Sequence, residues 1–319
     1  MAFGLFSKKQ KISNLVLTDE YIRYADVKAS EPLTVEGIGE RRLPEGIISE
    51  GKIIDRQTLE MIMEECVEEW GIKNRQIRFT VPSTYIILKN IFISEDIHDD
   101  EIKSHLFLEI GTSIHLPFEN PLFDIVVLGS SEGKKEVLLI AAPEDIILSY
   151  RELLEGVGLK PFIADISPLS LYRILYYQDK AEAKEHEMIL KFSAKMLTVS
   201  IFHEHRPIFL RPIHMNSEDN LRSTLDEGNE APIDFLLEDT VKEIEKVMNF
   251  YRYSLHKGEQ SVTKMILTGD HPHLHAIQDH LTNRLNLNIV LDQPAFEGEG
   301  GLVPITFHTA IGLGLKEVL

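Results

Sequence analysis

The chain of 319 residues is 43% hydrophobic and 26% charged, a composition typical of globular proteins, and its length predicts about two domains. Its 51 acidic residues outnumber its 33 Lys and Arg residues, and the formal charge of −18 argues against nucleic acid as a partner. The single cysteine, Cys66, cannot form an internal disulfide, which fits a reducing compartment.

Three short β-like runs open the chain, at residues 12–17, 21–28 and 33–37. The polar residues 18–20 favour a turn between the first two runs, so this region is predicted to be a meander. Two prolines and several glycines between residues 32 and 51 indicate the border of an inserted unit.

The stretch from residue 43 to residue 166 alternates strand-like and helix-like patterns more regularly than the rest of the chain. Apolar residues three and four apart predict a helix over residues 58–70, whose other face is acidic and solvated. Residues 76–81 and 86–93 are rich in β-branched side chains and flank a short turn, which predicts neighbouring strands. The remaining predictions here are helices at 102–110 and 143–156, a hairpin of 121–128 with 136–142, and a strand at 160–166.

The last part of the chain predicts a second set of strands and helices. Residues 216–232 are polar and acidic and are predicted to be a loop. No apolar run is long enough to cross a membrane. The predicted elements are helices at 168–177 and 234–253, strands at 188–192, 197–202, 207–213, 264–267 and 288–291, a helix ending near 285, and a final helix from 307.

Few side chains suggest chemistry by themselves. Cys66 lies in the apolar stripe of the first predicted helix and is expected to be a buried hydrophobe. The densest histidine group lies between His271 and His280, where the first residues flank a proline at a turn and no cysteine is near. No metal site is therefore expected, and no Gly-x-Ser-x-Gly nucleophile motif occurs.

Several local strings occur in an order and spacing that resemble one known family. They are LPEGIISEGKIID, IRFTVPSTYIILKNIFI, SHLFLEIGTSIHLPFENPLFDIVVLG, LLIAAPEDIILSYRELLEGVGLKPFIADI, EIEKVMNFYRYS and HTAIGLGLKEVL. Over nearly the whole chain these strings resemble the PilM family of type IV pilus assembly proteins, which are actin-like and related to the cell-division protein FtsA.

The resemblance implies an α/β fold of the actin-like type, with two halves around a cleft and an inserted α+β subdomain in the first half. It places the N-terminal strands of the first half in residues 1–45 and the inserted strand–helix–strand subdomain in residues 46–166. Residues 167–319 would contain the remainder of the core, with the second half and the C-terminal helix.

An actin-like fold normally holds ATP with glycine-containing turns, and an Asp in each of two hairpins orders the metal or the attacking water. Aligned on the first hairpin of the family, Val16 stands at the Asp position and Thr18 at the glycine. In the second hairpin, Lys191 stands at the Asp position and Ser193 at the glycine. Both hairpins therefore depart from the nucleotide-binding pattern.

The adenosine-side turn keeps only its first glycine, Gly269, which Asp270 follows. Without the two acidic residues the metal has no anchors, and the larger side chains crowd the backbone, so no measurable ATPase activity is expected. The resemblance thus implies a degenerate pseudo-ATPase that is not an enzyme and needs no cofactor. ATP binding without turnover stays open, because Lys191 can pair with a phosphate.

The resemblance further implies a scaffold of a type IV pilus or related secretion machine. It would bind the cytoplasmic tail of a PilN-like inner-membrane protein, link it to the motor ATPase and the platform protein, and lie in the cytoplasm at the inner face of the membrane. An extended tail gains main-chain hydrogen bonds in a groove. We expect that groove at the seam between the insertion and the N-terminal strands, with Thr80, Val81 and Ile86 as candidate contacts, although apolar strand residues are more often core.

Two alternatives belong to other functional classes. An actin-like ATPase or phosphotransferase needs an acidic residue near the phosphates, and neither aligned hairpin position supplies one. An FtsA-like polymerising protein would bind membrane through an amphipathic tail, whereas this chain ends at Leu319 directly after the predicted last helix. Self-association and the identity of the machine are left open by the sequence.

Overall fold

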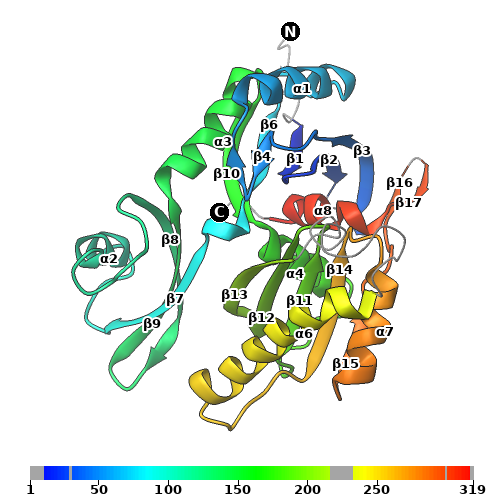
Figure 1. Cartoon of the computed structure of the whole chain (residues 1–319). Helices are drawn as coiled ribbons and strands as arrows, with labels where there is room; N and C mark the ends of the chain where they lie inside the picture. Colours follow the sequence, from blue (N-terminus) through cyan, green and yellow to red (C-terminus); the bar gives the residue numbers. More distant parts are fainter. Residues whose placement is uncertain (1–10, 29–30, 216–232, 299, 317–319) are drawn as a thin grey trace.

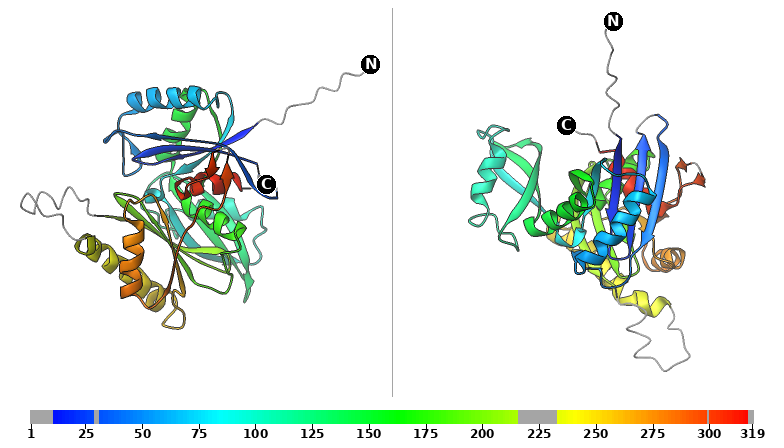
Figure 2. Two further views of the ribbon diagram at one scale, coloured as in Figure 1. Left: turned by 90° about the vertical axis from the view of Figure 1, so that its right-hand side faces the viewer. Right: turned by 90° about the horizontal axis from the view of Figure 1, so that it is seen from above.

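A computed structural model describes residues 11–28, 31–215, 233–298 and 300–316. The loop predicted for residues 216–232 lies outside these ranges. Two five-stranded sheets form the body of the protein, and a smaller three-stranded sheet projects from one side (Figures 1 and 2). The predicted α/β class with two halves is present in this arrangement.

The first sheet has the strand order β10-β6-β1-β2-β3. Its antiparallel meander consists of β1 (Ile12–Leu17), β2 (Tyr21–Lys28) and β3 (Thr34–Arg42), which confirms the predicted start of the chain. Strands β6 (Gln76–Val81) and β10 (Lys160–Ile166) extend the sheet in parallel with β1.

The second sheet has the order β13-β12-β11-β14-β15, which repeats the first. Strands β11 (Glu187–Phe192), β12 (Met196–His203) and β13 (Arg206–His214) form an antiparallel meander. Strands β14 (Lys264–Gly269) and β15 (Asn288–Leu291) follow in parallel with β11. Each half is therefore a meander extended by two parallel strands.

The small sheet has the order β7-β9-β8 and packs helix α2 (Ile102–Glu109) on one face. Its strands are β7 (Ile87–Ser94), β8 (Pro121–Ser131) and β9 (Lys134–Pro143), and β8 with β9 forms the predicted hairpin. Seen from above, this unit lies well to the side of the two main sheets (Figure 2).

The prediction that residues 76–81 and 86–93 are neighbouring strands is wrong. Strand β6 pairs with β1 and β10, whereas β7 pairs only with β9 among the described strands. The short helix η1 (Ser83–Tyr85) lies between them and leads the chain into the other sheet. The predicted inserted subdomain, residues 46–166, also differs from the structure, because β6 and β10 lie within that range but belong to the first sheet. Local patterns reveal strands but not their partners, which is the reason for both differences.

Helices α1 (Arg56–Glu69) and α3 (Glu144–Gly156) cover the outer face of the first sheet (Figure 1). Asp55 is the N-cap residue of helix α1, and its side chain accepts a 3.0 Å hydrogen bond from the Thr58 N–H group. Its apolar stripe, which includes Cys66, is buried against the strands as predicted.

Helices α4 (Ser167–Tyr177) and α8 (His308–Gly314) lie between the two main sheets (Figure 1). Helix α8 packs on the inner face of the first sheet and α4 on the inner face of the second. A Cβ atom at Gly312 would lie 1.9 Å from the carbonyl oxygen of Ser170, so glycine alone permits this contact between the two helices. The two halves are thus joined by a tightly packed helix pair.

Helices α6 (Ile233–Asn249) and α7 (Leu274–Arg284) cover the outer face of the second sheet. The predicted helix 234–253 ends its α-helical part earlier and continues as a π-helix over Phe250–Leu255. Short elements complete the described chain: hairpins β4 (Ile48–Ser49) with β5 (Lys52–Ile53) and β16 (Glu297–Gly298) with β17 (Gly301–Leu302), and the 3₁₀ helix η3 (Ile305–Phe307).

Candidate functional site

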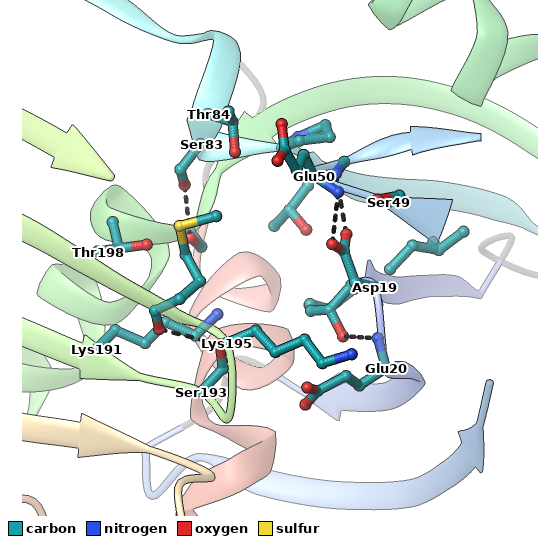
Figure 3. Close-up of a pocket in the computed structure, with 18 of the residues that line it drawn as sticks. Asp19, Glu20, Ser49, Glu50, Ser83, Thr84, Lys191, Ser193, Lys195 and Thr198 are labelled. Atoms are coloured by element: carbon teal, nitrogen blue, oxygen red, sulfur yellow. Dashed lines mark hydrogen bonds between the residues drawn. The ribbon is translucent and has the colours of Figure 1, made fainter. Parts of the chain in front are cut away.

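A cavity of about 360 Å³ lies where the turns of both halves meet (Figure 3). The first half contributes the β1–β2 turn, the β4–β5 turn and the segment after β6. The second half contributes the β11–β12 turn and the residue after β14. Hairpin turns from duplicated sheets that face one cavity are the arrangement in which an actin-like fold holds its nucleotide.

The residues singled out from the sequence come together here almost completely. Val16, Thr18, Lys191, Ser193 and Asp270 all line the cavity, whereas Gly269 does not. Of the three residues predicted to contact a partner, Thr80 and Val81 line the same cavity. Ile86 lies outside it and is buried in the core of the first half.

The side chain of Thr18 stabilises the β1–β2 turn from within. The hydroxyl of Thr18 accepts hydrogen bonds from the backbone N–H groups of Tyr21, at 3.0 Å, and Glu20, at 3.4 Å. Free N–H groups in such a turn are what would bind phosphate oxygens. Because the Thr18 hydroxyl already accepts from the N–H groups of Glu20 and Tyr21, these two donors are not free to bind a phosphate.

Asp19 fastens this turn to the neighbouring hairpin. Its two carboxylate oxygens accept hydrogen bonds from the N–H groups of Glu50, at 2.6 Å, and Gly51, at 2.9 Å (Figure 3). A carboxylate that accepts one hydrogen bond on each oxygen is held in a fixed orientation. Asp19 therefore has a structural partner in the β4–β5 turn, and it ties two walls of the cavity together.

The β11–β12 turn is also bonded internally. The N–H group of Ser193 donates to the Met196 carbonyl at 2.9 Å, and its hydroxyl donates to the same oxygen at 3.0 Å. Lys191 lies just before this turn and is partly buried. Burial lowers the pKa of the Lys191 ammonium; the negative charge of Asp270 opposes that shift and the positive charge of Arg23 adds to it.

A buried ion pair beside the cavity connects one half to the other. Arg23 in β2 contacts Asp270, which follows β14, at 2.7 Å, and it also contacts Glu40 in β3 at 2.6 Å. The second carboxylate oxygen of Asp270 is buried and has no hydrogen-bond partner among the described residues. Arg23, Asp270 and Lys191 thus form one charged cluster where the two halves meet.

Gly269 has a structural reason to be glycine. Its φ angle is +119°, and a Cβ atom would lie 2.0 Å from the carbonyl oxygen of Phe192. That same oxygen accepts a 2.9 Å hydrogen bond from the N–H group of Asp270. The glycine therefore permits the close approach of β14 to β11 and does not depend on a nucleotide for its explanation.

The charged side chains of the lining are more acidic than basic. Four carboxylates face two lysines: Asp19, Glu20, Glu50 and Asp270 against Lys191 and Lys195. Partial burial raises the pKa of Glu20, and Asp270 raises it further. Hydroxyl groups are the other abundant polar groups of the lining, at Thr18, Ser49, Thr80, Ser83, Thr84, Ser167, Ser193 and Thr198.

The remaining candidates from the sequence do not join this site. Among the described residues, no group of three or more His, Cys, Asp or Glu side chains is arranged to hold a metal ion. Cys66 is buried in the first half, and burial raises the pKa of its thiol to about 11. None of the described helices is long and apolar enough to cross a membrane.

Comparison with known proteins identifies the fold and the family. The sequence profile of a family described as "Type IV pilus assembly protein PilM" matches residues 20–217, more than half of the chain. No curated protein sequence matches the chain significantly.

Solved structures match over nearly the full length. A PilM–PilN type IV pilus biogenesis complex aligns with a TM-score of 0.75 at 18% identity, over 96% of this chain and 98% of that one. The ethanolamine utilization protein EutJ from Carboxydothermus hydrogenoformans follows with 0.54 at 11% identity, over 97% and 90%. A Bacteroides thetaiotaomicron protein with an actin-like ATPase fold has 0.50 at 10% identity, over 93% and 96%. These similarities show an actin-like fold, as the sequence predicted.

Proposed function

The chain belongs to the family of the type IV pilus assembly protein PilM, and from this premise we propose that it is a non-enzymatic scaffold which binds the cytoplasmic tail of a PilN-like inner-membrane protein. A role in type IV pilus assembly follows from the family itself. The scaffold would lie at the cytoplasmic face of the inner membrane, held there by its partners, and would connect the tail to the motor ATPase and the platform protein.

The observation that carries this proposal is the state of the two hairpin turns. In the β1–β2 turn the N–H groups of Thr18, Glu20 and Tyr21 are bonded within the turn, and in the β11–β12 turn that of Ser193 is. The two aligned Asp positions hold Val16 and Lys191. The surplus of carboxylates would repel the phosphates of a nucleotide. A polar cavity rich in hydroxyl groups and carboxylates instead suits the N–H groups and side chains of a peptide.

The tail has a natural path from the cavity to the small sheet. The segment Pro82–Thr84 forms one wall of the cavity and leads through η1 into β7. Strand β7 lies at one edge of the sheet order β7-β9-β8. An extended tail that enters along this wall can pair its main chain with an edge strand while its side chains occupy the cavity. Thr80 and Val81 lie at the base of this path.

Calorimetric titration of the full chain with a synthetic cytoplasmic tail of the neighbouring PilN-like protein tests the proposal. We expect saturable binding by the wild type. Thr84→Trp places an indole in the wall and is expected to weaken binding about tenfold or more, since one lost well-packed contact is worth at least about 1.4 kcal/mol. Thr282→Trp, an exposed position on α7, is the matched control and should bind as the wild type does. Equal binding by T84W would place the tail elsewhere.

A parallel titration with Mg-ATP separates the scaffold from an enzyme. We expect no turnover, and any ATP affinity should depend on Lys191, one of the two ammonium groups that line the cavity. Sustained ATP hydrolysis that disappears in Lys191→Met would contradict the non-enzymatic part of the proposal. Failure of the wild type to bind any tail peptide would contradict the partner instead.

A further inference from the structure

A second charged site lies at the edge of the first sheet, where β6 and β10 meet the end of α8. Three cations gather there around one buried carboxylate: Arg78 from β6, Arg173 from α4 and Lys316 after α8 surround Asp165 of β10. We propose that this basic cluster binds a phosphate group. None of its four residues lines the cavity described above, so the site is separate from the groove of the tail.

Asp165 is already shared by two of the cations. One of its oxygens contacts Arg173 at 2.7 Å and the other contacts Lys316 at 3.3 Å. Its side chain is almost fully buried, and the two contacts use both oxygens. The carboxylate therefore balances one of three positive charges and leaves two uncompensated within the cluster.

Arg78 is the cation of the cluster with the fewest compensating contacts. No carboxylate among the described residues forms an ion pair with it, and the hydrogen bond that one of its terminal nitrogens donates to the Gly314 carbonyl is long at 3.4 Å. Its Nε–H group is buried without any acceptor in the described chain. Burial lowers the pKa of the Arg78 guanidinium, the positive charge of Arg173 lowers it further, and the negative charge of Asp165 opposes the shift only in part. A half-buried guanidinium with so little compensation is costly unless an anion pairs with it.

The cluster is accessible from solvent. Arg173 and Lys316 are partly exposed, and the ring of Phe162 beside Arg78 is 38% exposed. Counted over the described residues, the cluster has an excess of two positive charges, whereas the whole chain has a formal charge of −18. An aromatic ring at the rim of a basic site gives the incoming group an apolar neighbour as well as charge.

Phosphate fits this arrangement because its charge can match the excess of the cluster, which a single carboxylate cannot do. Guanidinium groups bind phosphate oxygens through two parallel N–H···O bonds, and a lysine adds a point charge. A phosphate with one to two negative charges would neutralise the excess of the cluster. The phosphate of an anionic lipid headgroup and that of a soluble phosphomonoester share this chemistry, and experiment can separate them.

The first test uses inorganic phosphate on the full chain at constant ionic strength. We expect phosphate to raise the thermal unfolding midpoint of the wild type and to leave that of Arg78→Gln unchanged. The phosphate dissociation constant of R78Q should be larger by about tenfold or more, as expected for losing a charge-assisted hydrogen bond. Arg151→Gln removes an exposed arginine on α3 and serves as the charge-matched control, which should respond as the wild type does.

A purely structural role for Arg78 predicts a different pattern. In that case R78Q would unfold well below the wild type in phosphate-free buffer, and phosphate would shift neither protein. Under our proposal R78Q unfolds at or above the wild-type temperature without phosphate, because an uncompensated charge has been removed. Absence of any phosphate response in the wild type overturns the proposal.

Vesicles identify the source of the phosphate. Co-sedimentation of the wild type, and not of R78Q, with phosphatidylglycerol vesicles but not with phosphatidylcholine vesicles would assign a lipid headgroup. Binding of phosphomonoesters without vesicle binding would assign a soluble ligand. Both results support a phosphate site, and wild-type and R78Q proteins that behave alike in every arm contradict it.

Discussion

The two halves of the molecule have the same strand order but have replaced the two aligned acidic positions in different ways. Val16 and Lys191 each stand one residue before the end of the first strand of their sheet. Both residues line the cavity, but Val16 is 4% exposed and packs in the apolar core between the sheets, whereas Lys191 is only partly buried and places a cation beside Asp270. The aligned position is an apolar core residue in the first half and a cation in the second half.

The neighbouring core positions show why the fold tolerates both outcomes. Leu15 and Leu17 flank Val16 and pack under α1 and α3, and Leu190 and Phe192 flank Lys191 and pack under α6 and α7. The residues that pack under the outer helices therefore correspond in the two halves. The halves differ at the inward-facing position between them, which holds Val16 in one and Lys191 in the other.

Restoring an acidic residue in the first half should have the largest effect. Val16→Asp would place an unpaired carboxylate in an apolar core and is expected to lower the free energy of unfolding by about 4 kcal/mol. Chemical denaturation measures the change. Val126→Asp in β8, where the side chain is 48% exposed, is the control and should stay within about 0.5 kcal/mol of the wild type. A loss of less than about 1 kcal/mol in V16D would show that the core around position 16 tolerates a carboxylate.

Breaking the ion pair between the halves should come next. Arg23→Gln leaves Asp270 buried without its cation and is expected to cost about 3 kcal/mol of stability. The double variant R23Q/D270N removes the stranded charge and should recover part of that loss. Equal stability of the single and double variants would mean that Lys191 compensates Asp270 without help from the first half.

Removing the cation of the second half should stabilise the protein. The folded-state pKa of Lys191 lies below its ordinary value of 10.5, so the charged lysine costs stability at neutral pH. Lys191→Met is expected to raise the free energy of unfolding by about 1 kcal/mol at pH 7. The gain should shrink as the pH rises from the folded-state pKa towards 10.5 and vanish above 10.5, where the lysine is neutral in both states. A loss of stability at pH 7 would show that Asp270 needs Lys191.

The smallest effect is expected at Glu20, in the turn of the first half. Its folded-state pKa lies above 4.5, so its ionisation disfavours the folded state at neutral pH. Glu20→Gln should slightly raise the unfolding midpoint at pH 7. The gain should disappear as the pH falls below 4.5, where the carboxyl is protonated in both states. An increase that persists at low pH would point to a cause other than charge.

The sequence predicted the elements well and their partners poorly. The strand bounds 12–17, 21–28, 76–81, 160–166 and 288–291 are those of the structure, since alternation along a strand is a local signal. The pairing of β6 with β1, and of β7 with β9, depends on residues far apart in the chain. Pairing cannot be seen in local periodicity, and for the same reason residues 46–166 were grouped as one insertion.

The site was predicted in part for a similar reason. Alignment with a family placed Val16, Thr18, Lys191, Ser193 and Asp270 near one another, and they do share the cavity. The role of Asp19 as a link to the β4–β5 turn and the contact of Arg23 with Asp270 were missed. Both depend on contacts between segments that no spacing in the sequence connects.

The packing of the helix pair between the sheets also bears on how a load applied to one half would reach the other. All seven residues of α8 are buried, and at Gly312 its backbone touches that of α4. His308 at its start contacts the buried carboxylate of Asp292 at 2.7 Å, so the same helix is anchored to the second half as well. Because α8 is closely packed against both halves, one half cannot rotate against the other without repacking α8. A pull on a tail bound in the cavity would therefore load both halves together, as a single stiff body.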